Sequence, residues 1–269
     1  MEDISGGRRS KRKAKKLNVY VFFSSFRNGT SCLTLLTFDF FLVIMKIAIT
    51  SRNPHRLEMH KSTIRPYLSH ISDKPDAVLT VGGDGSFLAA ERFFPGIPKL
   101  LVREDSICKK CSCESLPDAL QKLFRERFAV QEFPKIEVTV NEKKMEAAND
   151  VVIRNVHPTH AIRFVLTING KKVPGELIGD GLVVSTAFGS QGYFQSITGR
   201  HFEQGFGIAF NNTTVKREPI IVPRMSIVLQ LTRGMAHVAA DNDPNIIVID
   251  KGEKVEIIQS SNVARIIKF

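Results

Sequence analysis

Apolar and polar positions along residues 45–134 follow the pattern of strands that alternate with helices. Short apolar runs rich in Val, Ile and Leu are bounded by polar or Pro-containing segments, and they cover residues 45–50, 76–81 and 98–102. Runs of this kind are typical of buried strands, whereas the segments 55–70 and 86–94 have helical spacing, interrupted in the first by Pro66. This alternation predicts a Rossmann-like parallel α/β domain with crossover helices.

The pattern changes after residue 134. Residues 135–140 alternate apolar and polar side chains, as a half-exposed strand does. Further short runs follow, separated by turn signals such as Asn169-Gly170, and they cover residues 161–168, 182–185, 220–222, 226–231, 246–249 and 255–258. Many short strands with few helices predict an all-β, β-sandwich-like second domain over residues 135–269, with its last strand a candidate to return to the first domain.

Residues 1–44 fit neither pattern. They carry a net charge of +5 out of +11 for the whole chain, mostly in the basic stretch 6–16, whose composition is typical of disorder. The apolar run 33–45 is too short to span a bilayer, which takes about 20 apolar residues. A targeting arm and a nuclear-localisation run are alternatives. We favour an extension outside the native fold, with synthesis beginning at Met45, because Met45 opens a strand directly.

The composition narrows the class of protein. Hydrophobic residues make up 43% of the chain, enough for a substantial core. Because nearly half of the basic excess lies in the first 44 residues, we predict no nucleic-acid partner, and because the composition is that of a soluble protein without a membrane-facing helix, we predict no membrane partner. Three of the four cysteines lie close together, at Cys108, Cys111 and Cys113. This spacing lacks the fourth ligand of a zinc site and favours a reduced loop in the cytoplasm, so we assign no metal-ligating residue.

The strongest chemical signal is the run Gly82-Gly83-Asp84-Gly85-Ser86, between a predicted strand and a predicted helix. Open α/β sheets bind ligands at this edge, where glycines let backbone amides approach phosphate oxygens. A carboxylate among these amides suits a base for an attacking hydroxyl, or a group that orients a metal. The alternative is a glycine turn in which Asp84 only caps the helix.

Two further motifs carry polar side chains beside buried strands. In residues 179–193 glycine-rich turns flank a strand and present Asp, Ser, Thr and Tyr side chains. Small residues there permit close approach of a flat ligand, and Tyr193 can cover it. Asn149-Asp150 precedes an apolar run and could hold ribose hydroxyls or an adenine edge, although a simple turn at the strand entry is the better interpretation of these two residues taken alone.

Together and in this order, the three motifs resemble the NAD kinase family. That family has Gly-Gly-Asp-Gly-Ser/Thr, then Asn-Glu, then Asp-Gly-x-x-x-Ser-Thr-x-x-Gly-Ser-x-x-Tyr, and the resemblance covers most of residues 45–269. It implies an ATP-dependent kinase that phosphorylates the adenosine ribose of NAD to give NADP, with Mg²⁺ as cofactor and ATP or polyphosphate as donor. It also implies a homo-oligomer, dimer or tetramer, with the NAD site between domains.

The resemblance also implies roles for individual residues. Asp84 would be the catalytic base that activates the 2′-hydroxyl of the ribose. The residues implied to bind the phosphates or the nucleotide are Gly82, Gly83, Gly85, Ser86 and Arg92. Those implied to bind NAD are Asn149, Asp150, Asp180, Thr186, Ser190, Tyr193 and Asp241, with Asp180 reaching the other ribose across a subunit boundary.

The chain departs from the family pattern around the acceptor. Asp150 replaces the usual Glu, Ala187-Phe188 replaces Pro-Thr, and Asn242 stands where Gly commonly follows the late Asp. The alternatives are therefore a related Gly-Gly-Asp-Gly kinase acting on a sugar, nucleoside or lipid hydroxyl, and a nucleotide-binding regulator without turnover. The pattern leaves open whether ATP or polyphosphate is the donor and whether NAD or NADH is the acceptor.

Overall fold

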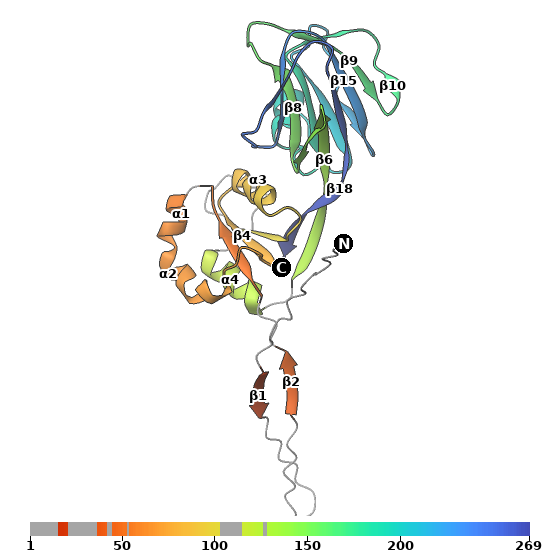
Figure 1. The fold of residues 1–269 in the computed structure, drawn as a ribbon. Coiled ribbons are helices and arrows are strands. Elements are labelled where there is room, and N and C mark those ends of the chain that lie inside the picture. Colours follow the sequence, from red (N-terminus) through yellow and green to blue (C-terminus); the bar gives the residue numbers. More distant parts are fainter. Residues whose placement is uncertain (1–15, 21–36, 42–44, 53, 103–114, 126–127) are drawn as a thin grey trace, which may run out of the picture. The chain divides into compact units, whose positions relative to one another are not determined.

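The computed structural model describes residues 16–20, 37–41, 45–52, 54–102, 115–125 and 128–269. The chain divides into two units, residues 1–45 and residues 46–269. In the first unit, strands β1 (Lys16–Tyr20) and β2 (Thr37–Phe41) pair antiparallel (Figure 1). The four cysteines, including the three predicted to form a metal-free loop, lie outside the described residues.

Three parallel strands begin the second unit. Strands β3 (Ile47–Thr50), β4 (Ala77–Val81) and β5 (Lys99–Val102) pair in the order β3-β4-β5. Every residue of β4 and β5 is buried, as expected for a sheet covered on both faces. Helices α3 (Asp84–Phe93) and α4 (Leu116–Arg125) each bury one apolar stripe. The predicted parallel α/β part is confirmed.

The segment predicted as one helix over residues 55–70 forms three short pieces instead. They are α1 (Pro54–Met59), α2 (Lys61–Ile64) and the 3₁₀ helix η1 (Arg65–His70). Pro66 has no backbone N–H and its ring clashes with the preceding turn, which explains the change from α to 3₁₀ geometry at this point. Within the described ranges, no helix combines the length and the apolar character needed to cross a membrane.

The rest of the chain forms a sandwich of two sheets around one core. One sheet is antiparallel, in the order β14-β13-β12-β8-β16-β17, and the other is the ten-stranded sheet that also contains the parallel strands. Alternate residues from both sheets form the main core, for example Ile153 on β8, Phe164 on β9 and Leu229 on β15. The predicted fold class, a parallel α/β part followed by a β-sandwich-like part, is confirmed.

The strands of this part have the following bounds: β6 (Ala129–Val140), β7 (Lys143–Ala147), β8 (Asp150–Asn155), β9 (Ile162–Ile168), β10 (Lys171–Lys172), β11 (Leu177–Gly179), β12 (Gly181–Thr186), β13 (Phe206–Asn211), β14 (Ile220–Val222), β15 (Ser226–Arg233), β16 (Ala236–Ala240), β17 (Ile247–Ile249) and β18 (Lys254–Lys268). One short helix, α5 (Tyr193–Thr198), covers part of the six-stranded sheet by packing on β12 and β13.

Two long strands, β6 and β18, belong to both parts of this unit. They pair antiparallel with each other over most of their length, and β18 also pairs with β15 at one end and, in parallel, with β5 at Ile266. We call β6 and β18 the crossing strands. The boundary placed at residue 134 by the sequence pattern therefore falls inside β6, so one continuous sheet joins the parallel strands to the sandwich.

A small second core lies where helix α3 meets the sandwich. Phe87 of α3 is buried and packs against Phe188, with ring centroids 5.1 Å apart, and Leu101, Ala264 and Ile266 join the same cluster. Phe133 packs on the other side of Phe188, at 4.9 Å between centroids. This cluster fixes helix α3 to both crossing strands.

We expect Phe87→Ala to destabilise the protein by about 3–5 kcal/mol, because a large cavity would replace a side chain with no exposed surface. Phe93→Ala on the same helix is the matched control, since Phe93 is 70% exposed. Urea unfolding followed by circular dichroism measures both. Equal stabilities of the two variants would show that the Phe87 cluster does not hold the helix.

Candidate functional site

The Gly-Gly-Asp-Gly loop joins β4 to helix α3 at the carboxyl edge of the parallel strands. Gly82 has φ of 131°, a conformation that strongly favours glycine, and its N–H donates to the carbonyl of Val102 on β5 at 3.0 Å. Gly83 caps the helix, and Asp84 is its first residue. The N–H groups of the first turn and the helix dipole therefore meet at this loop, an arrangement that binds phosphate groups.

Arg52 brings a cation to the same loop. It follows β3 at the same edge of the sheet, and its N–H donates to the Ser86 hydroxyl at 3.3 Å. Its guanidinium lies 3.1 Å from the position that a Cβ on Gly85 would occupy. Arg52 was not among the residues predicted from the sequence. The available signal was a basic residue directly after the first strand of a parallel sheet, where loops carry ligand-binding groups.

Asn242 connects the loop to a distant part of the chain. Its Nδ2 donates to the carbonyl of Gly85 at 2.8 Å, and its side-chain and backbone oxygens each accept from the Arg92 guanidinium at 3.2 Å. Arg92, predicted to bind phosphate, thus contacts Asn242. Asn242 appeared in the sequence only as a departure from the family pattern, and its contacts were not predicted.

Asp241, next in the chain to Asn242, organises the acceptor side. Its carboxylate accepts from the backbone N–H groups of Ala148, Asn149 and Asp150, at 2.8, 2.8 and 3.1 Å. Burial raises the pKa of this carboxyl group, while the three N–H groups oppose that rise because they favour the charged form. Asp241 was predicted to contact NAD, and the structure places its carboxylate on the backbone that carries Asn149 and Asp150.

Residues 148–150 also contact the third motif. The Thr186 hydroxyl donates to the carbonyl of Ala148 at 2.6 Å and accepts from the N–H of Gly189 at 3.0 Å. A Cβ on Gly189 would lie 2.3 Å from the carbonyl oxygen of Asn149, so glycine is required for this approach. Asn149 itself has a buried side-chain oxygen that accepts no hydrogen bond from the described residues.

These contacts bring most of the predicted site residues into one connected group. It runs from Asp84 and its glycines through Asn242 and Asp241 to Asn149 and Thr186. Asp150 lies beside them at the start of β8, opposite Ser185. The Ser190 hydroxyl donates to the carbonyl of Phe202 at 2.8 Å, within the buried part of this loop. The hydroxyl groups of Thr186 and Ser190 thus shape the loop.

Asp180 stands apart from this group. Asp180 directly precedes β12, whereas Thr186 is the last residue of that strand. At about 3.3 Å per residue of a strand, the two residues are about 20 Å apart. Gly181, with φ of 146° and no room for a Cβ beside the carbonyl of Ile153, sets the turn. The Asp180 carboxylate accepts from Asn155 at 3.4 Å and from Asn212 at 3.0 Å.

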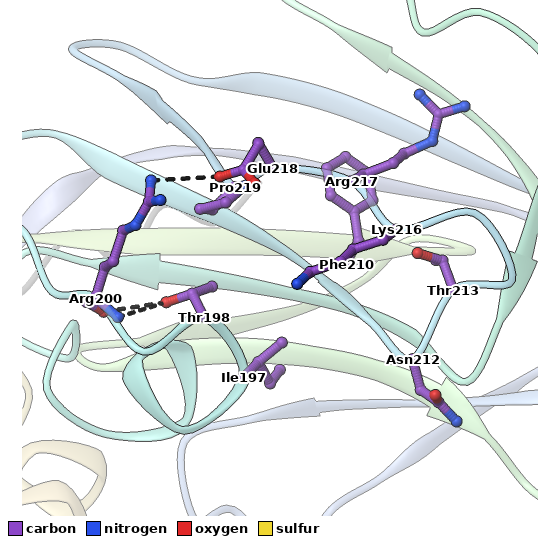
Figure 2. Close-up of a pocket in the computed structure, with 10 residues that line it drawn as sticks. All are labelled: Ile197, Thr198, Arg200, Phe210, Asn212, Thr213, Lys216, Arg217, Glu218 and Pro219. Atoms are coloured by element: carbon purple, nitrogen blue, oxygen red, sulfur yellow. Dashed lines mark hydrogen bonds and ion pairs between the residues drawn. The ribbon is translucent and has the colours of Figure 1, made fainter.

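A cavity of about 430 Å³ opens at this second end of β12 (Figure 2). Asn212, which donates to Asp180, lines it together with Phe210 and the basic residues Arg200, Lys216 and Arg217. Glu218 is its acidic residue and pairs with Arg200 at 3.3 Å. Tyr193 lies close by, because its hydroxyl accepts from Asn211 at 3.3 Å. The excess of basic groups suits an anionic ligand group.

Comparison with known proteins shows which family the chain resembles. Residues 148–269 match the family model of the ATP-NAD kinase C-terminal domain. The NAD kinase of Sulfurisphaera tokodaii is 25% identical over 247 residues, which cover 84% of this chain and 96% of that protein. The chain is thus similar to NAD kinases over most of its length. The NAD kinase of Gemmatimonas aurantiaca is 30% identical over 162 residues, which cover 55% of this chain and 56% of that protein.

Solved structures show the same similarity at the level of the fold. The crystal structure of an Archaeoglobus fulgidus NAD kinase in complex with ATP matches 83% of this chain and 94% of that chain, with a TM-score of 0.69 and 19% identity. Yeast NADH kinase complexed with NADH matches 95% of this chain and 91% of that chain, with a TM-score of 0.72 and 15% identity. The NAD kinase fold therefore extends over both parts of the second unit.

For this NAD kinase homologue we expect Asp241→Asn to lower stability by about 1–3 kcal/mol, because an amide N–H₂ would face backbone N–H groups that need an acceptor. The same change should lower ligand affinity, since residues 148–150 would shift. Asp73→Asn, in an exposed loop, is the control. Urea unfolding and calorimetric titration with NAD test both variants. Wild-type behaviour of Asp241→Asn would contradict the organising role of this carboxylate.

Proposed function

We propose that this chain transfers the γ-phosphoryl group of ATP to the 2′-hydroxyl of the adenosine ribose of NAD, giving NADP and ADP. One observation carries the proposal: motifs that lie far apart in the sequence form a single network of contacts, which begins at Gly85, the residue after Asp84. A phosphate loop lies at one end of that network and Asn149 at the other. This arrangement suits a two-substrate site, with the donor phosphates at the loop that carries Asp84 and the acceptor nucleoside at the other end of the network.

The proposed chemistry at Asp84 is a proton transfer. The carboxylate accepts the proton of the 2′-hydroxyl while the hydroxyl oxygen bonds to the γ-phosphorus, and the bond from that phosphorus to the bridging oxygen of ADP breaks. A base is needed because a ribose hydroxyl is a weak nucleophile at neutral pH. The loop amides and the nearby guanidinium of Arg52 would stabilise the charge on the transferred group.

The acceptor side supplies hydrogen bonds to the nucleoside. The buried Oδ1 of Asn149 is an acceptor without a donor among the described residues, which is costly unless a ligand provides one. The exocyclic amine of an adenine ring is a donor of the required kind. We therefore assign the adenine end of NAD to Asn149, with its ribose directed toward Asp84.

Mg²⁺ fits this site as a companion of the nucleotide. Among the described residues, no cluster of three or more His, Cys, Asp or Glu side chains could hold a metal ion by itself. Mg²⁺ is commonly held by one or two carboxylates and by substrate phosphates, so the phosphates of the nucleotide at this loop would supply most of its ligands and leave Asp84 to act as the base. When bound, the ion would neutralise charge on the donor phosphates.

Asp180 and the cavity beside it suit the far end of NAD bound to a second copy of the chain. Asp180 and Thr186 are about 20 Å apart along β12, so Asp180 lies away from the connected group that includes Asp84 in the same chain. In a symmetric oligomer, the same residue can complete the neighbouring site. The homo-oligomer and the cytoplasmic location stay predictions.

The first experiment is incubation of the purified chain with ATP, Mg²⁺ and NAD, with NADP detected by a coupled dehydrogenase. We expect NADP with the wild type. We expect Asp84→Asn to lower kcat by about 10²-fold to 10⁴-fold, because the base is lost, with NAD affinity near that of the wild type by calorimetry. Near-normal turnover in this variant would refute the base assignment. A folded wild type that binds ATP but forms no NADP would contradict the proposed acceptor.

Subunit complementation tests the role of Asp180. We expect Asp84→Asn and Asp180→Ala each to be inactive alone. If two copies share each site, coexpressed random dimers should recover about a quarter of the wild-type activity, because half of the dimers are mixed and each has one intact site. Recovery would be measured on the unfractionated mixture, and the mixed species isolated by tandem affinity purification should show about half of the wild-type activity. A mixed species as inactive as its parents would show that Asp180 does not act across a subunit boundary.

A further inference from the structure

Four charged side chains form a buried row between helix α3 and the sandwich. They alternate in sign, in the order Lys99, Glu91, Lys135 and Glu146, and we call them the buried charge chain. The side chains of the first three are exposed by 0, 3 and 3%, and that of Glu146 by 24%. Charged groups are rarely buried to this extent unless they are paired, so the row defines a specific arrangement of the elements that carry it.

On the helix side, the buried charge chain holds the end of α3. Glu91 lies seven residues, or two helical turns, after Asp84. Its carboxylate accepts from Lys99 of β5, from Lys135 at 3.2 Å, and from the N–H of Gly96 at 3.1 Å. The Lys99 ammonium also donates to the carbonyl of Phe94, the C-cap residue of α3, at 2.6 Å. The helix that begins with Asp84 is thereby fixed at its other end.

On the sandwich side, the last members of the buried charge chain lie on the hairpin of β6 and β7. Lys135 of β6 donates to Glu146 of β7 at 2.7 Å, and Glu146 also accepts from the Ser260 hydroxyl and, at 2.8 Å, from the Asn262 amide. Burial acts to lower the pKa of Lys135, but its hydrogen bonds and charge interactions with Glu146 and Glu91 outweigh burial and raise it. Lys135 is therefore charged at neutral pH.

Lys135 also occupies an irregular point of the crossing strands. Ile136 pairs with Gln259 and Pro134 pairs with Val263, so residues 260–262 of β18 stand opposite Lys135 alone. A bulge of this kind bends a strand and redirects side chains. The bend turns Lys135, on the face of β6 opposite the core residues Ile136 and Val138, toward Glu91, and it brings Ser260 and Asn262 to Glu146.

We propose that Lys135 is a positioning residue for phosphoryl transfer, which links Glu91 to Glu146 and so fixes helix α3, and with it Asp84, relative to the acceptor side. This inference rests on the proposed function. Asn242 holds the first turn of α3 through Gly85, and Lys135 holds its last turn through Glu91, so the two contacts together set the tilt of the helix. Misplacement of a reacting group by about 1 Å can cost about 10²-fold in rate.

The decisive variant is the charge-balanced pair Lys135→Met with Glu146→Gln. It removes the link but leaves Glu91 paired with Lys99, so no buried carboxylate loses its only cation. We expect kcat to fall by roughly tenfold or more, while the KM values for NAD and ATP change by less than about twofold. Lys135→Arg should retain most of the turnover, because it preserves the charge and both partners.

Lys144→Met is the matched control, because Lys144 pairs with Glu137 across the same hairpin at 2.8 Å but is exposed and does not reach helix α3. It should keep wild-type kcat within about twofold, as expected for a solvated pair. Glu146→Gln alone is a milder variant in case the double variant is unfolded at the assay temperature, and it should lower kcat in the same direction. Wild-type kcat in the folded double variant, or in Glu146→Gln if the double variant does not fold, would overturn the proposal.

Hydrogen exchange separates this inference from the proposed function. In the double variant, or in Glu146→Gln if the double variant does not fold, we expect the amides of residues 84–90 to exchange at least about tenfold faster than in the wild type. In Lys144→Met their exchange should be unchanged. This readout needs no NADP. Faster exchange in a protein whose wild type makes no NADP would support the link and reject the NAD kinase reaction. Unchanged exchange at residues 84–90 would overturn the link itself.

Discussion

The carboxylate of Asp241 is the interaction on which the site depends. It accepts from three successive backbone N–H groups at residues 148–150, and these residues in turn determine where Asn149, Thr186 and the Gly189 turn lie. A carboxylate that satisfies three amides at once has little freedom to move, because each lost bond would leave a buried donor without a partner. Asn242, the next residue, reaches the phosphate loop, so a single turn of chain connects donor and acceptor sides.

Electrostatics and packing serve the same end at helix α3. The Phe87 cluster fixes one face of the helix to Phe188 and the crossing strands, and the buried charge chain fixes its last turn. The energy of apolar contacts changes little with small shifts, whereas the energy of hydrogen-bonded charges in a buried environment depends strongly on their geometry. Buried apolar surface therefore keeps the helix in place, and the buried charge chain sets its orientation.

Much of the fold could be predicted from the sequence. Continuous apolar runs indicated the parallel strands, because a strand buried on both faces needs apolar residues throughout. Alternation of apolar and polar residues indicated the strands of the sandwich, because these are buried on one face only. Alternation also placed Lys135 on the exposed face of β6, yet it is buried, because the bulge opposite it changes which groups face that side. A break of pairing register in a distant strand leaves no trace in the local pattern.

The candidate site was predictable in part for the same reason. Asp84 and its glycines stand in a compact motif, so short-range sequence was enough to single them out. Asn242 and Arg52 act through tertiary contacts with Gly85 and Ser86, and the one local signal for either was the position of Arg52 directly after the first strand. Glu91 looked like one more polar residue of an amphipathic helix, because its two lysine partners come from strands that only the tertiary fold brings to it.

The position of β18 has a consequence for how the chain folds. The parallel strands β3, β4 and β5 meet the rest of their sheet through β18, which lies more than 150 residues further along the chain. An unpaired edge of β5 must therefore persist during synthesis until that distant strand arrives. Sheets that depend on pairing between strands far apart in the sequence fold slowly, and their unpaired strand edges are prone to aggregation until the pairing forms. Production of this protein should thus depend on chaperones and on growth temperature more than its final stability would suggest.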